Sequence, residues 1–170
     1  MTATWSVKSR LASVSPRIVL CLALAVGMLG ACNGGGGASA CGDPEPQRID
    51  PRSSQHLLPG APEPRYNTNP PTSGAHRPGP IPDNVLTSPM PKPEQVALLE
   101  AGHVLVQYRS AADGRALRSV ARAETHIAPG SGLPAPVVAT AWLWMMRCDS
   151  VDKSAIEKFV DAHAQQHASD

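Results

Sequence analysis

The sequence has no acidic residue before Asp43 and no apolar run long enough to cross a bilayer as a helix, which would need roughly 20 residues. The basic residues Lys8, Arg10 and Arg17 are followed by an uncharged apolar run from Ile18 to Met28. A positive start before a short apolar core of about 7–15 residues is the pattern of an export signal peptide. We therefore predict that the chain leaves the cytoplasm.

The residues after this run predict the type of signal. Leu29-Gly30-Ala31-Cys32 resembles the bacterial lipobox, in which small residues precede a cysteine that carries diacylglycerol. The pattern predicts a signal peptide over residues 1–31 and a lipoprotein held in the cell envelope, on the periplasmic or extracellular face, by acyl chains on Cys32. The alternatives are an uncleaved anchor and an ordinary secretory signal in which Cys32 is a spare thiol.

The mature chain also lacks an excess of basic residues. Removal of residues 1–31 takes away three of the fifteen Lys and Arg residues and none of the fourteen Asp and Glu residues, which leaves 12 against 14 and a net charge of −2. Nucleic-acid binders normally present a basic surface. The expected partner is thus the lipid bilayer and not a nucleic acid, and no protein or small-ligand partner is indicated.

Two of the four cysteines remain once Cys21 leaves with the signal and Cys32 takes the lipid. Cys41 and Cys148 would lie in a compartment that permits oxidation, and we predict a disulfide between them. The alternative is two unrelated thiols, one in a linker and one in the core.

The chain after Cys32 changes in composition along its length. A glycine-rich stretch follows the cysteine, most of the eighteen prolines lie between residues 41 and 93, and the more apolar part begins near Pro91. Proline disfavours helices and central strands. We therefore predict a flexible tether over 32–52, one domain over 53–165 whose N-terminal half is an extended Pro-rich wrap, and a tail over 166–170.

Local patterns predict a small α+β domain, with helices packed on a mixed sheet. Gly102 should end the first helix, Asp113-Gly114 should form a turn, and Asp152 should cap the last helix. The predicted elements are a helix over 93–101, a strand over 103–108, a helix over 115–123, a short strand over 125–127, one central strand over 137–146 and a helix over 153–164.

The segment from Tyr66 to His76, which contains Pro-Pro-Thr-Ser-Gly-Ala-His, resembles the signature of a bacterial family called domain of unknown function 3105. The resemblance covers roughly residues 53–163. It implies kinship in fold and no established activity. Family members are similar in carrying a helical His-x-x-x-His pair, but the matching positions here are Ala97 and Ala101, beside Glu100.

Four residues are candidate ligands for a metal ion or small molecule, namely His56, His76, Glu100 and His103. Imidazole and carboxylate groups suit zinc or copper. The alternative is that His76 binds backbone groups in a turn and Glu100 pairs with an arginine. We expect a non-catalytic envelope binding module, with a zinc- or copper-binding module as the alternative. A hydrolase-like enzyme is a second alternative, for which no Gly-x-Ser-x-Gly elbow or oriented nucleophile is present.

Overall fold

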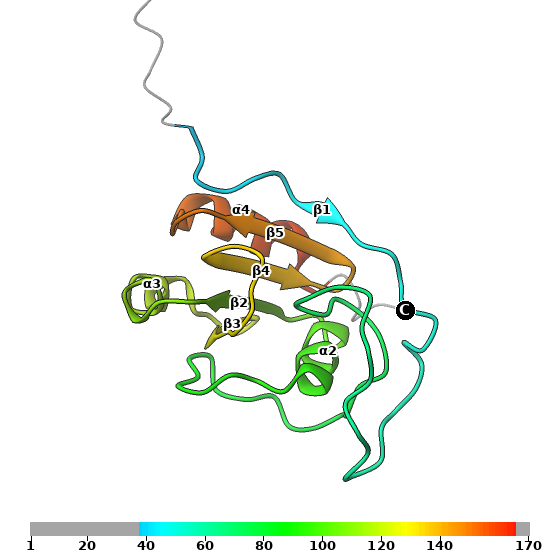
Figure 1. Cartoon of the computed structure of the whole chain (residues 1–170). Coiled ribbons are helices and arrows are strands. Elements are labelled where there is room, and N and C mark those ends of the chain that lie inside the picture. Colours follow the sequence, from blue (N-terminus) through cyan, green and yellow to red (C-terminus); the bar gives the residue numbers. More distant parts are fainter. Residues whose placement is uncertain (1–37, 166–170) are drawn as a thin grey trace, which may run out of the picture. The chain divides into compact units, whose positions relative to one another are not determined.

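Five strands form one mixed sheet in the order β1-β5-β4-β2-β3 (Figure 1). The computed structural model describes residues 38–165. Strands β2 and β3 are parallel, and the other neighbours in the sheet are antiparallel. The strands are β1 (Glu45–Pro46), β2 (Val104–Tyr108), β3 (Thr125–Pro129), β4 (Val137–Ala141) and β5 (Trp144–Cys148). The helices are α2 (Lys92–Glu100), α3 (Ala111–Leu117), the 3₁₀ turn η1 (Arg118–Val120) and α4 (Lys153–His163).

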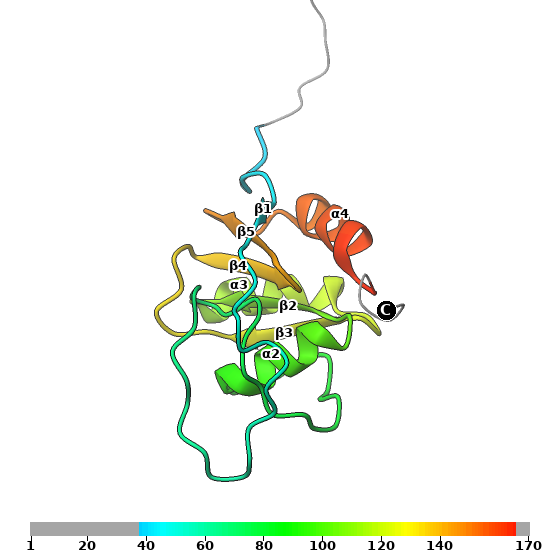
Figure 2. The same ribbon diagram turned by 90° about the vertical axis from the view of Figure 1, so that its right-hand side faces the viewer.

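The helices cover both faces of this sheet, which confirms the predicted α+β class. Successive side chains of a strand point to opposite faces. Accordingly Val104 and Val106 of β2 pack in the cluster that contains Phe159 of α4, whereas Leu105 packs with Leu99 of α2. Figure 2 shows α4 and α2 on opposite sides of the strands. Each fully buried side chain of this kind contributes about 1.5–3 kcal/mol, so the sheet is fixed from both sides.

Two helix ends follow the sequence signals. Gly102 has a φ of +84° after the last turn of α2, a conformation that glycine adopts at little cost, and the chain turns there into β2. The carboxylate of Asp152 accepts a hydrogen bond from the backbone N–H of Ala155 at 3.0 Å, and so caps α4. Both predicted boundaries are confirmed.

The predicted central strand over 137–146 is wrong. The run forms the hairpin of β4 and β5, and Leu143 in its turn has a φ of +59°. Met145 and Met146 then lie on opposite faces of β5. The turn was missed because Trp142-Leu143 contains none of the usual turn residues.

The predicted turn at Asp113-Gly114 is also wrong, because both residues lie within α3. The hydroxyl of Ser110 accepts a hydrogen bond from the N–H of Asp113 at 3.1 Å and caps this helix. A Cβ at position 114 would lie 2.4 Å from the ring of Tyr108. Gly114 is therefore needed for close packing, not for a turn, and the predicted helix over 115–123 is replaced by α3 and η1.

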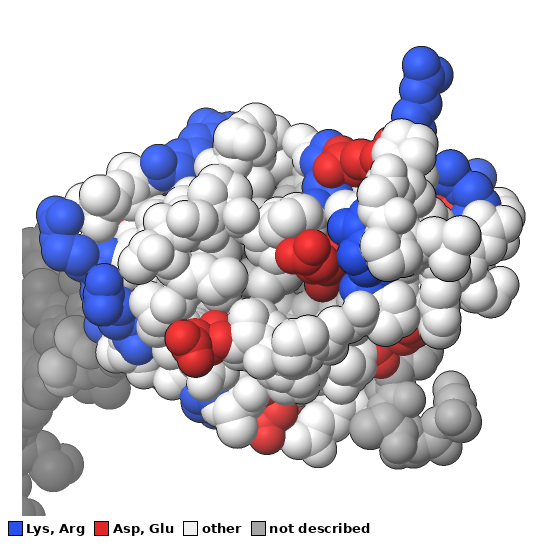
Figure 3. Space-filling view, turned by 90° about the horizontal axis from the view of Figure 1, so that it is seen from below, with Lys and Arg blue, Asp and Glu red and all other residues white. Residues whose placement is uncertain are grey.

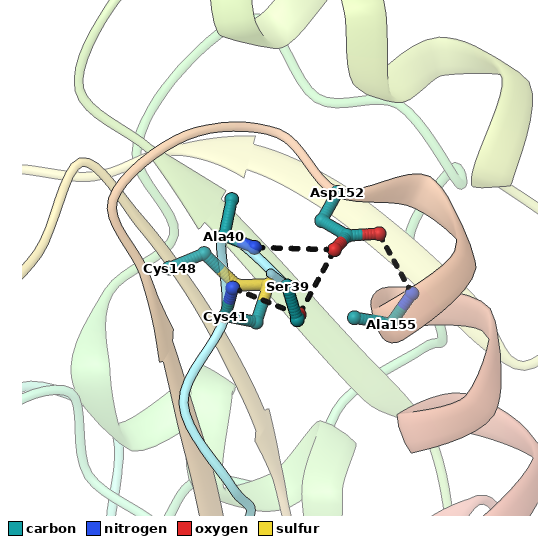
Figure 4. The surroundings of a disulfide bond; sticks show 6 residues. All are labelled: Ser39, Ala40, Cys41, Cys148, Asp152 and Ala155. Carbon is teal, nitrogen blue, oxygen red and sulfur yellow. Dashed lines mark hydrogen bonds between the residues drawn. A yellow bond between two sulfur atoms is a disulfide. The ribbon is translucent and has the colours of Figure 1, made fainter. Parts of the chain in front are cut away.

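The Pro-rich chain runs along the sheet and around α2 (Figure 1), and a disulfide between Cys41 and Cys148 fixes its start. Figure 4 shows that Asp152 lies beside this bond, where its carboxylate accepts hydrogen bonds from the Ser39 hydroxyl and the Ala40 N–H. Strand β1 pairs with β5. The predicted tether over 32–52 is thus too long, because the chain is bound to the domain from Ser39 onward.

Among residues 38–165, no helix is long and apolar enough to cross a membrane. The predicted signal peptide, Cys32 and the tail over 166–170 lie outside the residues that the structure describes.

Candidate metal centre

The signature segment is held by one hydrogen bond to the preceding chain and by another within itself. The hydroxyl of Ser73 accepts a hydrogen bond from the Asp50 N–H at 2.9 Å, and the Tyr66 hydroxyl donates to the Ala75 carbonyl at 2.9 Å. Burial raises the pKa of Tyr66 to about 12. Since Ser73 already serves as a structural acceptor and Tyr66 stays protonated at neutral pH, neither group is prepared as a nucleophile.

Asp50 holds the next part of this wrap. Its carboxylate is almost fully buried and forms an ion pair with Arg52 at 2.8 Å. The hydrogen bond from the Arg52 guanidinium lowers the pKa of the Asp50 carboxyl, although burial acts in the opposite direction. Arg52 also donates to the Arg65 carbonyl. The pair therefore ties the chain before His56 to the chain before the signature segment.

His56 and His76 are brought together by backbone pairing. The N–H of His76 donates to the Gln55 carbonyl at 3.0 Å, and the N–H of Leu57 donates to the His76 carbonyl at 2.7 Å. These bonds make a parallel bridge in which His56 and His76 are partners. Their ring centroids lie 4.8 Å apart, with 68° between the ring planes.

The His76 ring is held in one orientation. It is 0% exposed, and its Nδ1 lies 3.1 Å from the Gly74 carbonyl oxygen. A carbonyl can only accept, so we assign the Nδ1 proton to this bond. In the neutral ring, the lone pair is then on Nε2. Metal-binding histidines usually donate their second ring N–H in this way, which orients the ligand nitrogen.

Glu100, at the last position of α2, closes the cluster. Its Oε2 lies 2.7 Å from the Nε2 of His76. Yet Nε2 is buried and, among the described residues, has no partner with the alignment of a hydrogen bond. A contact can be short without the alignment that a hydrogen bond needs. The carboxylate and the nitrogen are therefore in close contact without forming a hydrogen bond.

One ligand atom from each of His56, His76 and Glu100 lies within 4.8 Å of the other two. Tetrahedral zinc with bonds of roughly 2.0–2.1 Å places its ligand atoms about 3.3 Å apart. The Glu100 side chain is 41% exposed and His56 is exposed, so both can adjust toward that spacing around the fixed His76. Two imidazoles and a carboxylate are a donor set for zinc or copper.

The fourth candidate, His103, lies in a different pair. Its Nδ1 is 2.9 Å from the Nε2 of His126, and the Nδ1 of His126 is 3.2 Å from the Asp83 carbonyl oxygen. Burial lowers the pKa of both histidines. His126 was not predicted, because only the parallel pairing of β2 with β3 places it beside His103.

Ala97 lies on α2, the helix that carries Glu100, and Ala101 is the residue just after its end. Residues three or four apart share a helix face, so Ala97 precedes Glu100 on the same side, one turn earlier. Ala97 is half-buried and Ala101 is exposed. The histidine pair that the family resemblance implies is thus absent here, and Glu100 is grouped instead with His56 and His76.

Comparisons with known proteins give one match. The chain matches no curated protein and no solved structure. The family described as protein of unknown function (DUF3105) matches residues 62–170, a range that includes His76 and Glu100 and begins after His56. The predicted resemblance is confirmed, and the chain belongs to the DUF3105 family.

Proposed function

We propose that this protein is a lipid-anchored envelope protein whose domain binds an exchangeable transition-metal ion, zinc or copper, through His56, His76 and Glu100. One observation carries the proposal. The buried Nε2 of His76, whose ring is held by the Gly74 carbonyl, faces two further ligand groups from separate parts of the chain.

A simple ion pair explains this arrangement less well. If Glu100 served only to pair with His76, the ring would carry an N–H at Nε2 that aligns with the carboxylate as a charge-assisted hydrogen bond, and Nε2 has no such partner among the described residues. An ion pair also gives no reason for His56 to lie within reach of both groups. A metal ion would satisfy all three.

The number and exposure of the ligands support a role in metal handling. Structural zinc sites are normally closed by four protein ligands, whereas sites with three keep a position for water or another molecule. Two of the three ligands here are accessible to solvent. We therefore infer that the ion can enter, leave and accept an outside ligand, and that it does not hold the fold together.

Metal analysis tests this role directly. The full-length protein, purified in detergent, would be loaded with zinc or copper, dialysed and measured by elemental analysis. We expect one ion per chain. His76→Ala should weaken binding by more than the about 10–100-fold lost with an outer-shell partner, and Glu100→Gln should weaken it too. The matched control His103→Gln should bind as the wild type does. If the wild-type protein retains no metal, the metal-binding proposal is wrong, and the binding module that the sequence predicts must bind something else.

The anchor rests on the sequence alone. Lys8 to Met28 gives the export pattern, and the lipobox-like tetrapeptide ends at Cys32. Two or three acyl chains would hold the protein on the bilayer, since one chain gives only marginal binding. Labelling of growing cells with radioactive palmitate should mark the wild type and the control Cys21→Ser, but not Cys32→Ser. Equal label in Cys32→Ser would contradict the anchor.

The distribution of charge gives no support for nucleic-acid binding. On the face seen in Figure 3, lysine and arginine side chains are scattered, with acidic side chains between them. Arg147 pairs with Glu45, and Lys92 pairs with Glu63. The mature net charge of −2 supports the same conclusion.

A further inference from the structure

A pocket lies at the opposite end of α2 from Glu100. It has a volume of about 180 Å³ and is lined by the start of this helix, by Asn69 and Pro70 of the signature segment, and by Gly130, Ser131 and Leu133. Met90 and Leu133 supply apolar walls. Pockets for drug-sized ligands measure roughly 300–1,000 Å³, so this one suits a molecule with only a few non-hydrogen atoms.

Two buried glutamines from different elements line this pocket, Gln95 of α2 and Gln107 of β2. They are 5% and 3% exposed. The side-chain nitrogen of Gln95 donates to the Met90 carbonyl at 2.7 Å, which fixes which end of this amide is the oxygen. In both residues Oε1 is buried and has no hydrogen-bond partner within the described chain.

The two unpaired Oε1 atoms beside one pocket indicate a ligand that carries hydrogen-bond donors. Roughly 90% or more of buried polar groups in proteins are paired, and an unpaired carbonyl has lost its water without gaining a protein partner. Terminal amide torsions are soft, so each oxygen has freedom to adjust toward a donor in the pocket. A ligand that carries two or more N–H groups would satisfy both.

The charges at the rim favour a cation over an anion. Lys92 and Glu63 both line the pocket, and their charged groups lie 3.5 Å apart, partly exposed. This pair offers the interior no net charge, while the two amide oxygens present partial negative charge. We propose that the pocket binds a small molecule through an ammonium or guanidinium head group, whose N–H groups donate to Gln95 and Gln107.

The experiment uses the full-length, ¹⁵N-labelled protein in detergent with EDTA, so that the candidate metal centre plays no part. Ethylammonium and methylguanidinium are titrated while the side-chain amide signals of Gln95 and Gln107 are followed by NMR. We expect saturable shifts with a dissociation constant in the millimolar range, as suits so few ligand atoms. Tetramethylammonium, which has the charge but no N–H, should cause no saturable shift.

Substitution gives the second arm. Gln107→Met keeps a similar size without the carbonyl and should weaken binding at least tenfold, whereas the control Gln47→Met, outside the pocket, should leave it unchanged. If Gln107→Met does not fold, Gln95→Met replaces it. The proposal is overturned if no probe saturates, as for a pocket that holds water only. It is also overturned if tetramethylammonium binds equally well, or if neither pocket substitution weakens binding.

Discussion

The carbonyl oxygen of Gly74 accepts the Nδ1 proton of His76 at 3.1 Å, and this contact orients the ring toward His56 and Glu100. The carbonyl takes its position from a backbone conformation with a φ of +130° at Gly74. A Cβ at this position would lie 2.9 Å from the ring of Tyr66. The glycine of the signature segment thus helps to position His76, the proposed metal ligand two residues later.

Gly74→Ala should therefore lower both stability and metal affinity. The strained conformation alone costs about 1–3 kcal/mol for a residue with a side chain, and the ring of Tyr66 must also move. Urea unfolding gives the stability, and dialysis against zinc gives the affinity. Gly79→Ala is the matched control, because its φ is ordinary and no atom lies within 4 Å of the added Cβ. We expect a change within about 0.5 kcal/mol there; an equal loss in both variants would count against the role of Gly74.

Ala97→His should raise metal affinity. Position 97 precedes Glu100 by three residues on α2 and so shares its face of the helix. A histidine there would offer a fourth ligand, and four ligands complete a tetrahedral zinc site. Competition with a chelator of known affinity measures the change, which we expect to be at least about tenfold. Ala123→His, in the loop after η1, serves as the control. If Ala97→His does not raise the metal affinity, a side chain at position 97 cannot reach an ion held by His56, His76 and Glu100.

Much of the fold could be predicted because its signals are local. Gly102 after α2 and the Asp152 cap of α4 each act within one turn of the helix that they bound. The β4–β5 hairpin could not be predicted in this way. Leu143 adopts a left-handed conformation between two apolar strands, and only pairing of those strands makes such a turn favourable. A continuous apolar run gives no local sign of it.

The site residues also differ in whether local sequence signals could identify them. His76 could be selected because it ends a recognisable motif, and Glu100 because it lies at the junction of a predicted helix and a predicted strand. His126 and Gln107 could not, since each depends on which element lies next to β2. His103 lies at the same predicted junction as Glu100, but Gly102 lies between them and turns the chain. The structure accordingly places His103 against His126.

Reduction of the Cys41–Cys148 disulfide should destabilise the domain without unfolding α2 from the sheet. The bond closes a loop with a sequence separation of 107 residues, for which the chain-entropy model gives about 4–5 kcal/mol. Urea unfolding with and without reductant measures the difference. The intact mass should not change under an alkylating agent until reductant is added. The Cys41→Ala/Cys148→Ala variant should match the reduced protein and should not respond to reductant; a wild type equally stable in both states would contradict this account.

The pair of His103 and His126 should make stability depend on pH in the mildly acidic range. Burial lowers the pKa of both groups in the folded protein, so the unfolded chain takes up protons first as the pH falls below about 6.5. Because the unfolded state then binds more protons, the free energy of unfolding decreases with falling pH, and it levels off once the folded histidines titrate as well. The carboxyls of Asp50 and Asp152 also have lowered pKa values, but the stability that they contribute is lost only below about pH 4, which is a separate pH range.

Thermal unfolding between pH 7.5 and 5, with EDTA present, should show the decrease in stability caused by the two histidines in the wild type. His126→Gln keeps a donor for the Asp83 carbonyl and removes one titrating group, so its stability should fall less over the same interval. An identical slope in the two proteins would mean that other groups cause the dependence.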